Sequence, residues 1–205
     1  MSVRMKVMVI KVAHDFNCGW CWIGWNQTRR LKQAFDVSFD WVAHELMPED
    51  LPWNDPEPTP QVASNRPKTP SRMRLAWYAS NVPVPAVTIP PKLRTHNALE
   101  ATEYFKSLGD PEPFMDRVYR ALWERGENIS SIDVLLNLAE GLGDPDELRR
   151  AIEQKQFYDR IVKYDDDSYA AGVYNVPTFF IGDERYAEQP YDVLADAIQA
   201  ELERQ

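Results

Sequence analysis

Cysteine and histidine are both scarce in this chain. Among 205 residues there are two cysteines, Cys18 and Cys21, and three histidines, His14, His44 and His96. A bond between the two cysteines would close so short a loop that its entropic benefit would be near its minimum, which argues against a structural disulfide. A structural zinc site takes about four ligands, and no second C-x-x-C exists to supply them. A site of two cysteines, His14 and a carboxylate stays an alternative, as does a pair of buried, inert thiols.

Long apolar runs and basic surfaces are lacking as well. No stretch approaches the length of a membrane-spanning helix, so we expect no membrane association. Lys and Arg number 23 against 32 Asp and Glu, which gives a net charge of −9, and the basic residues are not gathered into a stripe. Nucleic acid is therefore not expected as a partner. Hydrophobic residues make up 44% of the chain, which is enough for the full core of one domain with an insertion.

The N-terminal segment has positive charge before an apolar run, as a signal peptide has, but it lacks the rest of that pattern. The run is short, is interrupted by Lys11 and His14, and has no small-residue cleavage site after it. We therefore interpret 7–13 as a first strand and expect a cytoplasmic protein, in a compartment where thiols are kept mostly reduced. A C-x-x-C pair there is more often catalytic or metal-binding than structural.

The C-x-x-C pair lies where this strand meets a helix, because apolar residues follow it near helical spacing from Trp22 to Phe35. The unpaired N–H groups of the first helical turn and the positive end of the helix dipole favour a thiolate at that point. Cys18, normally the more exposed member, is the candidate nucleophile. Cys21 can then attack a mixed disulfide and release the partner.

Four side chains around the pair carry further expectations. Asp15 either relays a proton to or from Cys21 or ends the strand as a turn residue. His14 either supports the thiolate by its charge when protonated or faces solvent at the strand end. Trp22 and Trp25 lie three residues apart and can share one helix face, packed against an inserted helical part of the chain.

A second feature stands far downstream, in the segment 172–182. Pro177 comes at the very start of an apolar strand, where its missing N–H costs least, and a small polar turn precedes it. A short hairpin and an amphipathic helix follow. The order along the chain is thus strand, C-x-x-C helix, long middle, proline strand, hairpin and helix.

The middle of the chain begins with a proline-rich stretch. Eleven of the sixteen prolines fall between Pro48 and Pro91. They predict an extended loop with one helix near 71–80. Trp53 favours a loop that lies against the active face.

The remaining helices and one further strand are predicted from local sequence patterns. Residues 37–43 alternate apolar with polar and predict a second strand. Serine, threonine or aspartate caps and glycine stops predict helices at 95–108, 112–125, 130–138 and from 144 onward. A further helix is expected over 157–171, ended by Gly172.

These pieces resemble the thioredoxin-fold disulfide oxidoreductases of the DsbA-like group and, within it, the FrnE-type subfamily. The matching pieces are Asp15-x-x-Cys18-x-Trp20-Cys21-x-Ile23-Gly24, Thr95-x-x-Ala98-Leu99-Glu100-Ala101, Asn128-Ile129-Ser130 with Val134-Leu135, and Ala171-Gly172-Val173-x-x-Val176-Pro177-Thr178-Phe179. The resemblance implies an α/β chain, a thioredoxin fold with an all-helical insertion. It divides the chain into a thioredoxin-type N-terminal part (1–60), a proline-rich loop with the helical insertion (61–155) and a thioredoxin-type C-terminal part (156–205).

The resemblance also implies how the site works. Cys18 and Cys21 would be the catalytic pair, and the Val176–Pro177 bond would be cis and face them, so that the backbone beside Pro177 pairs with an extended substrate segment. Trp20 either grips an apolar peptide or small aromatic ligand at the surface or is buried against the proline-rich loop. The substrate would be a protein or small molecule that carries a thiol or a disulfide. We expect no resident cofactor or metal, with glutathione as a redox partner.

Two other functions stay open. Kappa-class glutathione transferases and 2-hydroxychromene-2-carboxylate isomerases share this fold but typically carry serine at the Cys18 position and activate glutathione. A resolving Cys21 is superfluous in that chemistry, so its presence favours redox work. The other alternative is a zinc-binding or redox-sensing module. The chain departs from FrnE-type relatives at Gly19, where proline is common, so a relative's redox potential does not transfer.

Overall fold

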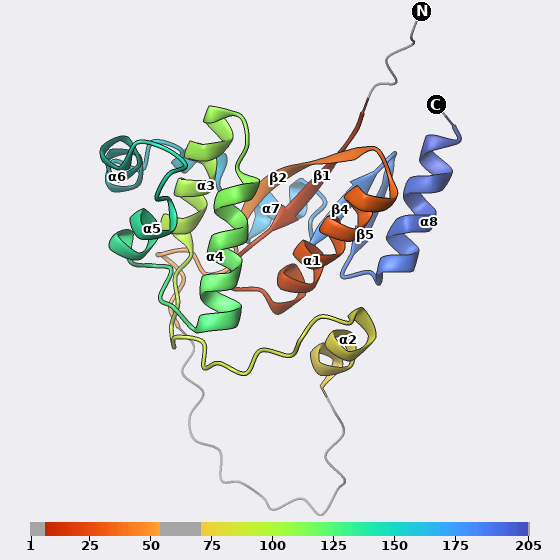
Figure 1. Ribbon diagram of the computed structural model, residues 1–205, viewed down its shortest axis with the longest axis horizontal. Coiled ribbons are helices and arrows are strands. Elements are labelled where there is room, and N and C mark those ends of the chain that lie inside the picture. The colour runs from red at the N-terminus through yellow and green to blue at the C-terminus, as the bar shows by residue number, and fades with distance from the viewer. Residues whose placement is uncertain (1–6, 54–70, 205) are drawn as a thin grey trace, which may run out of the picture.

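The computed structural model describes residues 7–53 and 71–204 (Figure 1). Five strands form one mixed sheet in the order β3-β2-β1-β4-β5. They are β1 Met8–His14, β2 Val37–Glu45, β3 Val162–Lys163, β4 Thr178–Ile181 and β5 Glu184–Ala187. The helices are α1 Gly19–Ala34, α2 Arg72–Ser80, α3 His96–Leu108, α4 Glu112–Arg125, α5 Ile132–Leu138, α6 Pro145–Glu153, α7 Asp166–Ala170 and α8 Tyr191–Leu202, with a 3₁₀ turn η1 at Tyr158–Arg160.

Strand β1 is the centre of the sheet and positions the site. It pairs in parallel with β2, from Met8 opposite Val37 onward, and α1 provides the crossover that parallel neighbours require. On its other side β1 pairs antiparallel with β4, so that Ala13, near its end, lies opposite Thr178, where β4 begins. The C-x-x-C turn after β1 and the proline before β4 therefore meet at one edge of the sheet.

The segment between β2 and β3 carries α2 to α6. Figure 1 shows α3 to α6 gathered beside the sheet, whereas α2 lies apart from them and next to α1. Fully buried side chains on α3 and α4, among them Leu99, Phe114 and Tyr119, continue the core from the sheet into these helices. Within the described part of the chain, no helix is both long and apolar enough to cross a membrane.

The domain boundaries expected from the sequence fall in different places. The boundary at 60 and 61, together with residues 54–70 of the proline-rich loop, lies outside the described residues. The boundary at 155 and 156 falls between α6 and η1.

Arg94 holds the loop after β2 in place. Its guanidinium carbon lies 4.8 Å from the ring centroid of Trp53, and it donates hydrogen bonds to the carbonyl oxygens of Met47 (2.7 Å) and Leu51 (2.9 Å). Residues 47–53 are thus fixed against the segment that leads into α3. The position of Trp53 on the active face stays a prediction.

Most of the elements expected from the sequence are present. The strands at 7–13 and 37–43 appear as β1 and β2, the helix near 71–80 is α2, and the four helices from residue 95 are α3 to α6. Ser71, Ser131 and Asp144 cap α2, α5 and α6 by accepting backbone N–H groups. Thr95 is the N-cap residue of α3, but its side chain makes no capping bond and instead bonds to Asp15.

The single helix expected over 157–171 is wrong. The chain there forms η1, β3 and the short α7. Val162 and Lys163 pair with the end of β2 and extend the sheet, and the Asp165 carboxylate accepts the N–H of Asp167 at 3.0 Å, which starts a new turn. Pairing with a distant strand and a competing aspartate turn outweigh the helical spacing of the apolar residues here.

Candidate active site

Cys18 lies directly beside the turn that contains Pro177, the residue before β4. It is the N-cap residue of α1, and its thiol donates to the carbonyl oxygen of Val176 at 3.2 Å. The Val176–Pro177 peptide bond is cis. The structure therefore brings together three residues that are far apart in the sequence, Cys18, Val176 and Pro177. Cys18 is 9% exposed and Cys21 is 1% exposed. Cys18 is thus the more exposed of the two, as expected, but only by a small margin.

Cys21 lies one turn further into α1 and is more deeply buried, at 1% exposure. Both cysteines are free thiols. Burial raises the pKa of the Cys21 thiol well above its ordinary value, and the hydrogen bond with Cys18 raises it further, whereas the backbone N–H of Asp15 bonds to Cys21 and opposes this. The Cys21 thiol therefore stays protonated near neutral pH unless a neighbouring group accepts its proton.

A buried carboxyl, that of Asp15, lies close to Cys21. The Asp15 carboxylate is 1% exposed and accepts the backbone N–H groups of Leu46 (2.7 Å) and Asn17 (3.1 Å). Burial raises the pKa of Asp15 to about 6, although these hydrogen bonds and that of Thr95 oppose the shift. Asp15 therefore forms the turn after β1 and also stands as a buried carboxyl close enough to Cys21 to interact with its charge.

Both expectations for His14 are wrong. The side chain is fully buried, and its Nδ1 atom shares a hydrogen bond of 3.0 Å with the hydroxyl of Tyr119. Burial lowers the pKa of His14 to about 3, so the ring is neutral at neutral pH and neither faces solvent nor supports a thiolate by positive charge. No local pattern indicates this contact, because Tyr119 stands 105 positions away on α4.

The tryptophans of α1 separate into two environments. Trp22 and Trp25 pack against Tyr119 of α4, with ring centroids 6.0 Å and 5.3 Å away, and the Trp25 indole donates to Asp116 at 3.1 Å. This confirms that the two rings face the helical insertion. Trp20 turns the other way and is half-buried beneath the guanidinium of Arg72 in α2, at 4.8 Å.

Gly24 is a site residue whose role emerges only from the structure. A Cβ atom at this position would lie 2.9 Å from Cγ of Pro177, closer than real contacts allow. The absence of a side chain lets α1 approach the cis-proline turn. A glycine inside a helix is unfavourable by about 1 kcal/mol relative to alanine, and that local cost was the available signal.

Metal ligation finds little support in this geometry. Among residues 7–53 and 71–204, no three His, Cys, Asp or Glu side chains are grouped so that they can hold a metal ion. His14, the histidine nearest to the cysteines in sequence, turns its Nδ1 atom to Tyr119.

Comparison with known proteins finds one matching family model and one similar curated protein. The model of the DSBA-like thioredoxin domain matches residues 9–199. A Bacillus subtilis (strain 168) protein, the uncharacterized YwbO, is 29% identical over 178 residues, which cover 85% of this chain and 86% of that protein.

Three solved structures share the fold. A probable DsbA oxidoreductase of Streptomyces coelicolor superposes with a TM-score of 0.68 at 17% identity, covering 97% of this chain and 91% of its own. A 2-hydroxychromene-2-carboxylate isomerase gives 0.64 at 17% identity, with coverages of 96% and 95%. The cytosolic disulfide reductase DsbM from Pseudomonas aeruginosa, solved with GSH, gives 0.62 at 17% identity, with coverages of 97% and 98%. At these identities the likeness concerns the fold, an α/β thioredoxin fold of the DsbA-like kind.

Proposed function

The chain belongs to the DSBA-like thioredoxin domain family, and from that membership we propose that it is a thiol–disulfide oxidoreductase that cycles Cys18 and Cys21 between dithiol and disulfide. One observation carries the proposal. The Cys18 thiol lies 3.2 Å from the carbonyl oxygen that precedes the cis-proline, with the Cys21 thiol hydrogen-bonded beside it. An attacking sulfur and a resolving sulfur beside it are what a thiol–disulfide exchange needs.

The exchange proceeds in two steps. The Cys18 thiolate attacks one sulfur of a substrate disulfide; that S–S bond breaks, a mixed disulfide forms, and the first substrate thiolate leaves. Cys21 then attacks the Cys18 sulfur, which forms the Cys18–Cys21 disulfide and releases the second substrate thiolate. Two electrons pass from the dithiol to the substrate, and each departing thiolate takes up a proton. The reverse sequence oxidises a substrate dithiol.

Asp15 serves the second step as the proton acceptor for Cys21. Burial keeps Cys21 protonated, so its attack requires loss of that proton to a neighbouring base. The pKa of Asp15, about 6, leaves the carboxyl mostly ionised yet still basic near neutral pH, which is where a general base is effective. In the reverse direction the Asp15 carboxylic acid returns the proton to the departing Cys21.

The cis-proline turn is proposed to dock the substrate. The backbone of Val176 and Pro177 forms one wall beside Cys18, and Trp20 with Pro177 lines an adjoining cavity. An extended segment that pairs with this backbone presents its sulfur to Cys18, and Trp20 contacts the neighbouring substrate residue. The substrate is accordingly a thiol- or disulfide-bearing peptide, protein or small molecule, with glutathione as the redox partner.

The remaining expectations are part of the same proposal. We assign 1–60 and 156–205 to the thioredoxin-type parts and 61–155 to the proline-rich loop with the helical insertion. A cytoplasmic location is proposed, in keeping with the described cytosolic reductase of the same fold, which was solved with GSH.

Redox titration tests the function. The protein is equilibrated with mixtures of reduced and oxidised glutathione, and the dithiol fraction is measured by thiol trapping. We expect a reversible two-electron transition in the parent chain, none in Cys18→Ala, and in Cys21→Ala a stable mixed disulfide with glutathione at Cys18. A parent chain whose two thiols do not bridge reversibly would contradict the proposal.

The second candidate is glutathione-dependent isomerisation or transfer, which the fold shared with 2-hydroxychromene-2-carboxylate isomerase favours. That chemistry leaves Cys21 without a role. Turnover of an isomerase or transferase substrate that requires glutathione and survives in Cys21→Ser would select it over redox exchange. Stoichiometric zinc retained after purification without added metal would instead favour the zinc-binding alternative.

A further inference from the structure

Helix α2 lies over the first residue of the active helix. A Cβ atom on Gly19 would stand 3.2 Å from Sδ of Met73 and 3.2 Å from Cζ2 of Trp77. These distances are tighter than most real contacts of a Cβ atom, so a side chain at position 19 would force Met73 and Trp77 to move by a few tenths of an ångström. Gly19, which follows Cys18, thus lets α2 rest directly on the C-x-x-C turn.

The proposed nucleophile, Cys18, has little contact with solvent. Cys18 is 9% exposed, with Val176 and Pro177 on one side and the residues of α2 above its neighbour Gly19. A disulfide on the surface of a folded protein must bring two polypeptide backbones to this sulfur. Helix α2 narrows the approach to this sulfur on the side of Gly19.

A small cavity is left between α2 and the cis-proline turn. It has a volume of about 110 Å³. Its walls are Trp20 and Ile23 of α1, Ala76 and Ala79 of α2, and Pro177 with the segment before α8. A cavity of about 150 Å³ holds a benzene molecule, so this one takes a single small group beside Pro177.

The contacts that hold α2 in place are weak. All nine residues of α2 are described, and each stays at least partly exposed. Arg72 pairs with Glu188 at 2.7 Å, with the Arg72 side chain 74% exposed and that of Glu188 10% exposed, so solvent screens the pair from the side of Arg72. The indole N–H of Trp77 is buried without an acceptor among the described residues, which disfavours the closed position.

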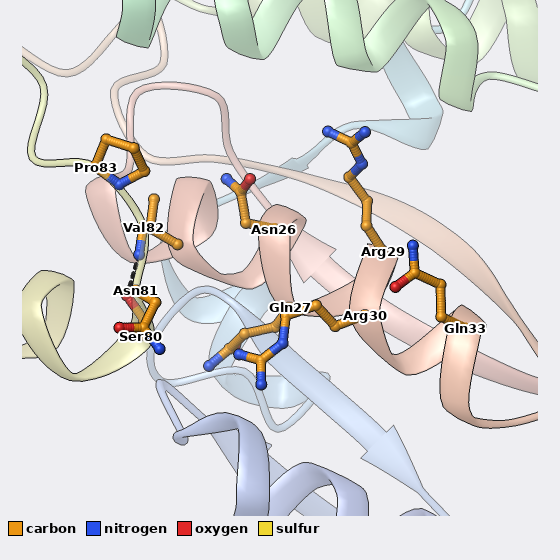
Figure 2. A pocket seen from close by; sticks show the side chains of 9 residues that line it. All are labelled: Asn26, Gln27, Arg29, Arg30, Gln33, Ser80, Asn81, Val82 and Pro83. Atoms are coloured by element: carbon orange, nitrogen blue, oxygen red, sulfur yellow. Dashed lines mark hydrogen bonds between the residues drawn. The ribbon is translucent and has the colours of Figure 1, made fainter.

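The C-terminal end of α2 also stands off from α1. Figure 2 shows Ser80 to Pro83 on one side of a pocket and the polar side chains of α1, Asn26 to Gln33, on the other. The pocket has a volume of about 470 Å³. Met73 and Trp77 thus contact α1 at Gly19, whereas the end of α2 borders this pocket. A helix held by so few contacts opens at low free-energy cost.

We propose that α2 selects the substrates of Cys18 by size, with Met73 and Trp77 as specificity-determining residues. With α2 in place the dithiol exchanges with low-molecular-weight disulfides of glutathione size, whose small groups fit the cavity beside Pro177. A disulfide in a folded protein reacts only after α2 is displaced. This inference rests on the proposed function and names its substrate class.

Alkylation of Cys18 tests the size filter without any turnover. In a Cys21→Ser background, Cys18 is modified with N-ethylmaleimide and with the same maleimide attached to a polyethylene glycol chain. Trp77→Ala and Met73→Ala are expected to raise the rate with the polymer reagent by about tenfold and that with the small reagent by about threefold or less. Leu75→Ala is the matched control, since Leu75 is 52% exposed on the same helix, and it should change neither rate.

Arg72→Ala gives a milder opening if Trp77→Ala does not fold. It removes both the ion pair with Glu188 and the contact with Trp20, and it should raise the same rate ratio. An unchanged ratio in the folded Arg72, Met73 and Trp77 variants overturns the size filter.

Turnover provides the second readout. In the Cys21-containing protein, Trp77→Ala should increase reduction of insulin disulfides relative to reduction of oxidised glutathione. If the parent cycles with glutathione and this preference stays constant, size selection fails while the proposed function stands. If the parent does not cycle, the proposed function fails, and the alkylation ratios still decide the role of α2.

Discussion

At the scale of single residues, the proposed exchange depends on how a proton reaches and leaves Cys21. The Asp15 carboxyl is buried and has a pKa of about 6. The neighbouring His14 ring is kept neutral by burial, which lowers its pKa to about 3. Of the two side chains, Asp15 is therefore the one that exchanges a proton near neutral pH, and His14 serves as a hydrogen-bond partner for Tyr119.

Asp15→Asn removes this proton acceptor with little change in size. We expect the release of the substrate from its mixed disulfide with Cys18 to slow by about a hundredfold or more at pH 7, because a general base typically contributes about 10²- to 10⁴-fold. The dependence of that step on a group of pKa about 6 should disappear. Stopped-flow release of a chromophoric thiol across pH 5 to 8, on the order of one point per half unit, measures both.

A matched control for this variant is Asp146→Asn, on the exposed surface of α6. It should leave the rate and its pH profile unchanged. Because Asp15 also accepts the N–H of Leu46, circular dichroism must show a folded Asp15→Asn protein. A folded variant with the parent's rate and pH profile would show that Cys21 loses its proton by another route.

The sequence carried the reacting residues but not their surroundings. Cys18 and Cys21 are recognisable because a C-x-x-C at a strand–helix junction is a local pattern, and Pro177 because it opens an apolar strand. The neutral state of His14 depends on Tyr119, 105 positions away. Burial of this kind follows from tertiary packing, which no local pattern contains.

Among the helices and strands, those with local caps were predicted well and those fixed by distant contacts were not. Helices α5 and α6 begin where Ser131 and Asp144 accept backbone N–H groups. By contrast, the place of α2 over Gly19 follows from contacts across more than fifty positions, and β3 exists because β2 offers an edge. A propensity for helix or strand says nothing about such pairings.

The approach of α1 to the cis-proline turn gives a prediction at this scale. Gly24→Ala places a Cβ 2.9 Å from Cγ of Pro177, so the helix or the turn must shift. Helix propensity alone would stabilise the variant by about 1 kcal/mol. We expect instead a loss of about 1–3 kcal/mol, the usual result of overpacking, and slower exchange with glutathione disulfide.

Urea unfolding and exchange kinetics measure these two effects of Gly24→Ala. Helix propensity alone predicts a more stable variant, whereas contact with Pro177 predicts a less stable one, so the sign of the change decides between them. A variant that is more stable than the parent and exchanges at the parent's rate would mean that Pro177 does not press on α1.

Across the whole molecule, one core joins the sheet to the helical part, and it encloses ionisable groups that should make stability depend on pH. Burial lowers the pKa of His14 to about 3 and that of His44 to about 4, so the unfolded chain binds two protons that the native chain does not as the pH falls below 6.5. Stability is therefore lost on acidification. Asp15, with its raised pKa of about 6, acts in the opposite sense below pH 6, as does Glu103 to a smaller extent.

His96 makes the folded state less stable as the pH rises above neutral. Burial alone would lower its pKa, but hydrogen bonds and charge from Glu100 and Glu45 raise it to about 9, with His96 Nδ1 3.0 Å from the Glu45 carboxylate. The stability that this pairing contributes is fully present below pH 6.5, the pKa of an unperturbed histidine, and is lost as the pH rises through 9. Stability should consequently be greatest near pH 6.5 and fall on both sides.

His96→Gln tests this balance, because it removes the cation between two buried carboxylates and leaves His14 and His44 in place. We expect the variant to be less stable than the parent at pH 6.5 by about 1–3 kcal/mol, because solvent screening at this partly exposed ring reduces the effect of the rise in its pKa from 6.5 to about 9. The variant should also lose the decline in stability between those two pH values. The acid decline should persist, since it belongs to the other two histidines, and it serves as the internal control. Urea midpoints of the parent and of His96→Gln, measured from acid pH to pH 9, test this expectation. An alkaline decline that survives in the variant would assign it to other groups and would remove His96 as the cause.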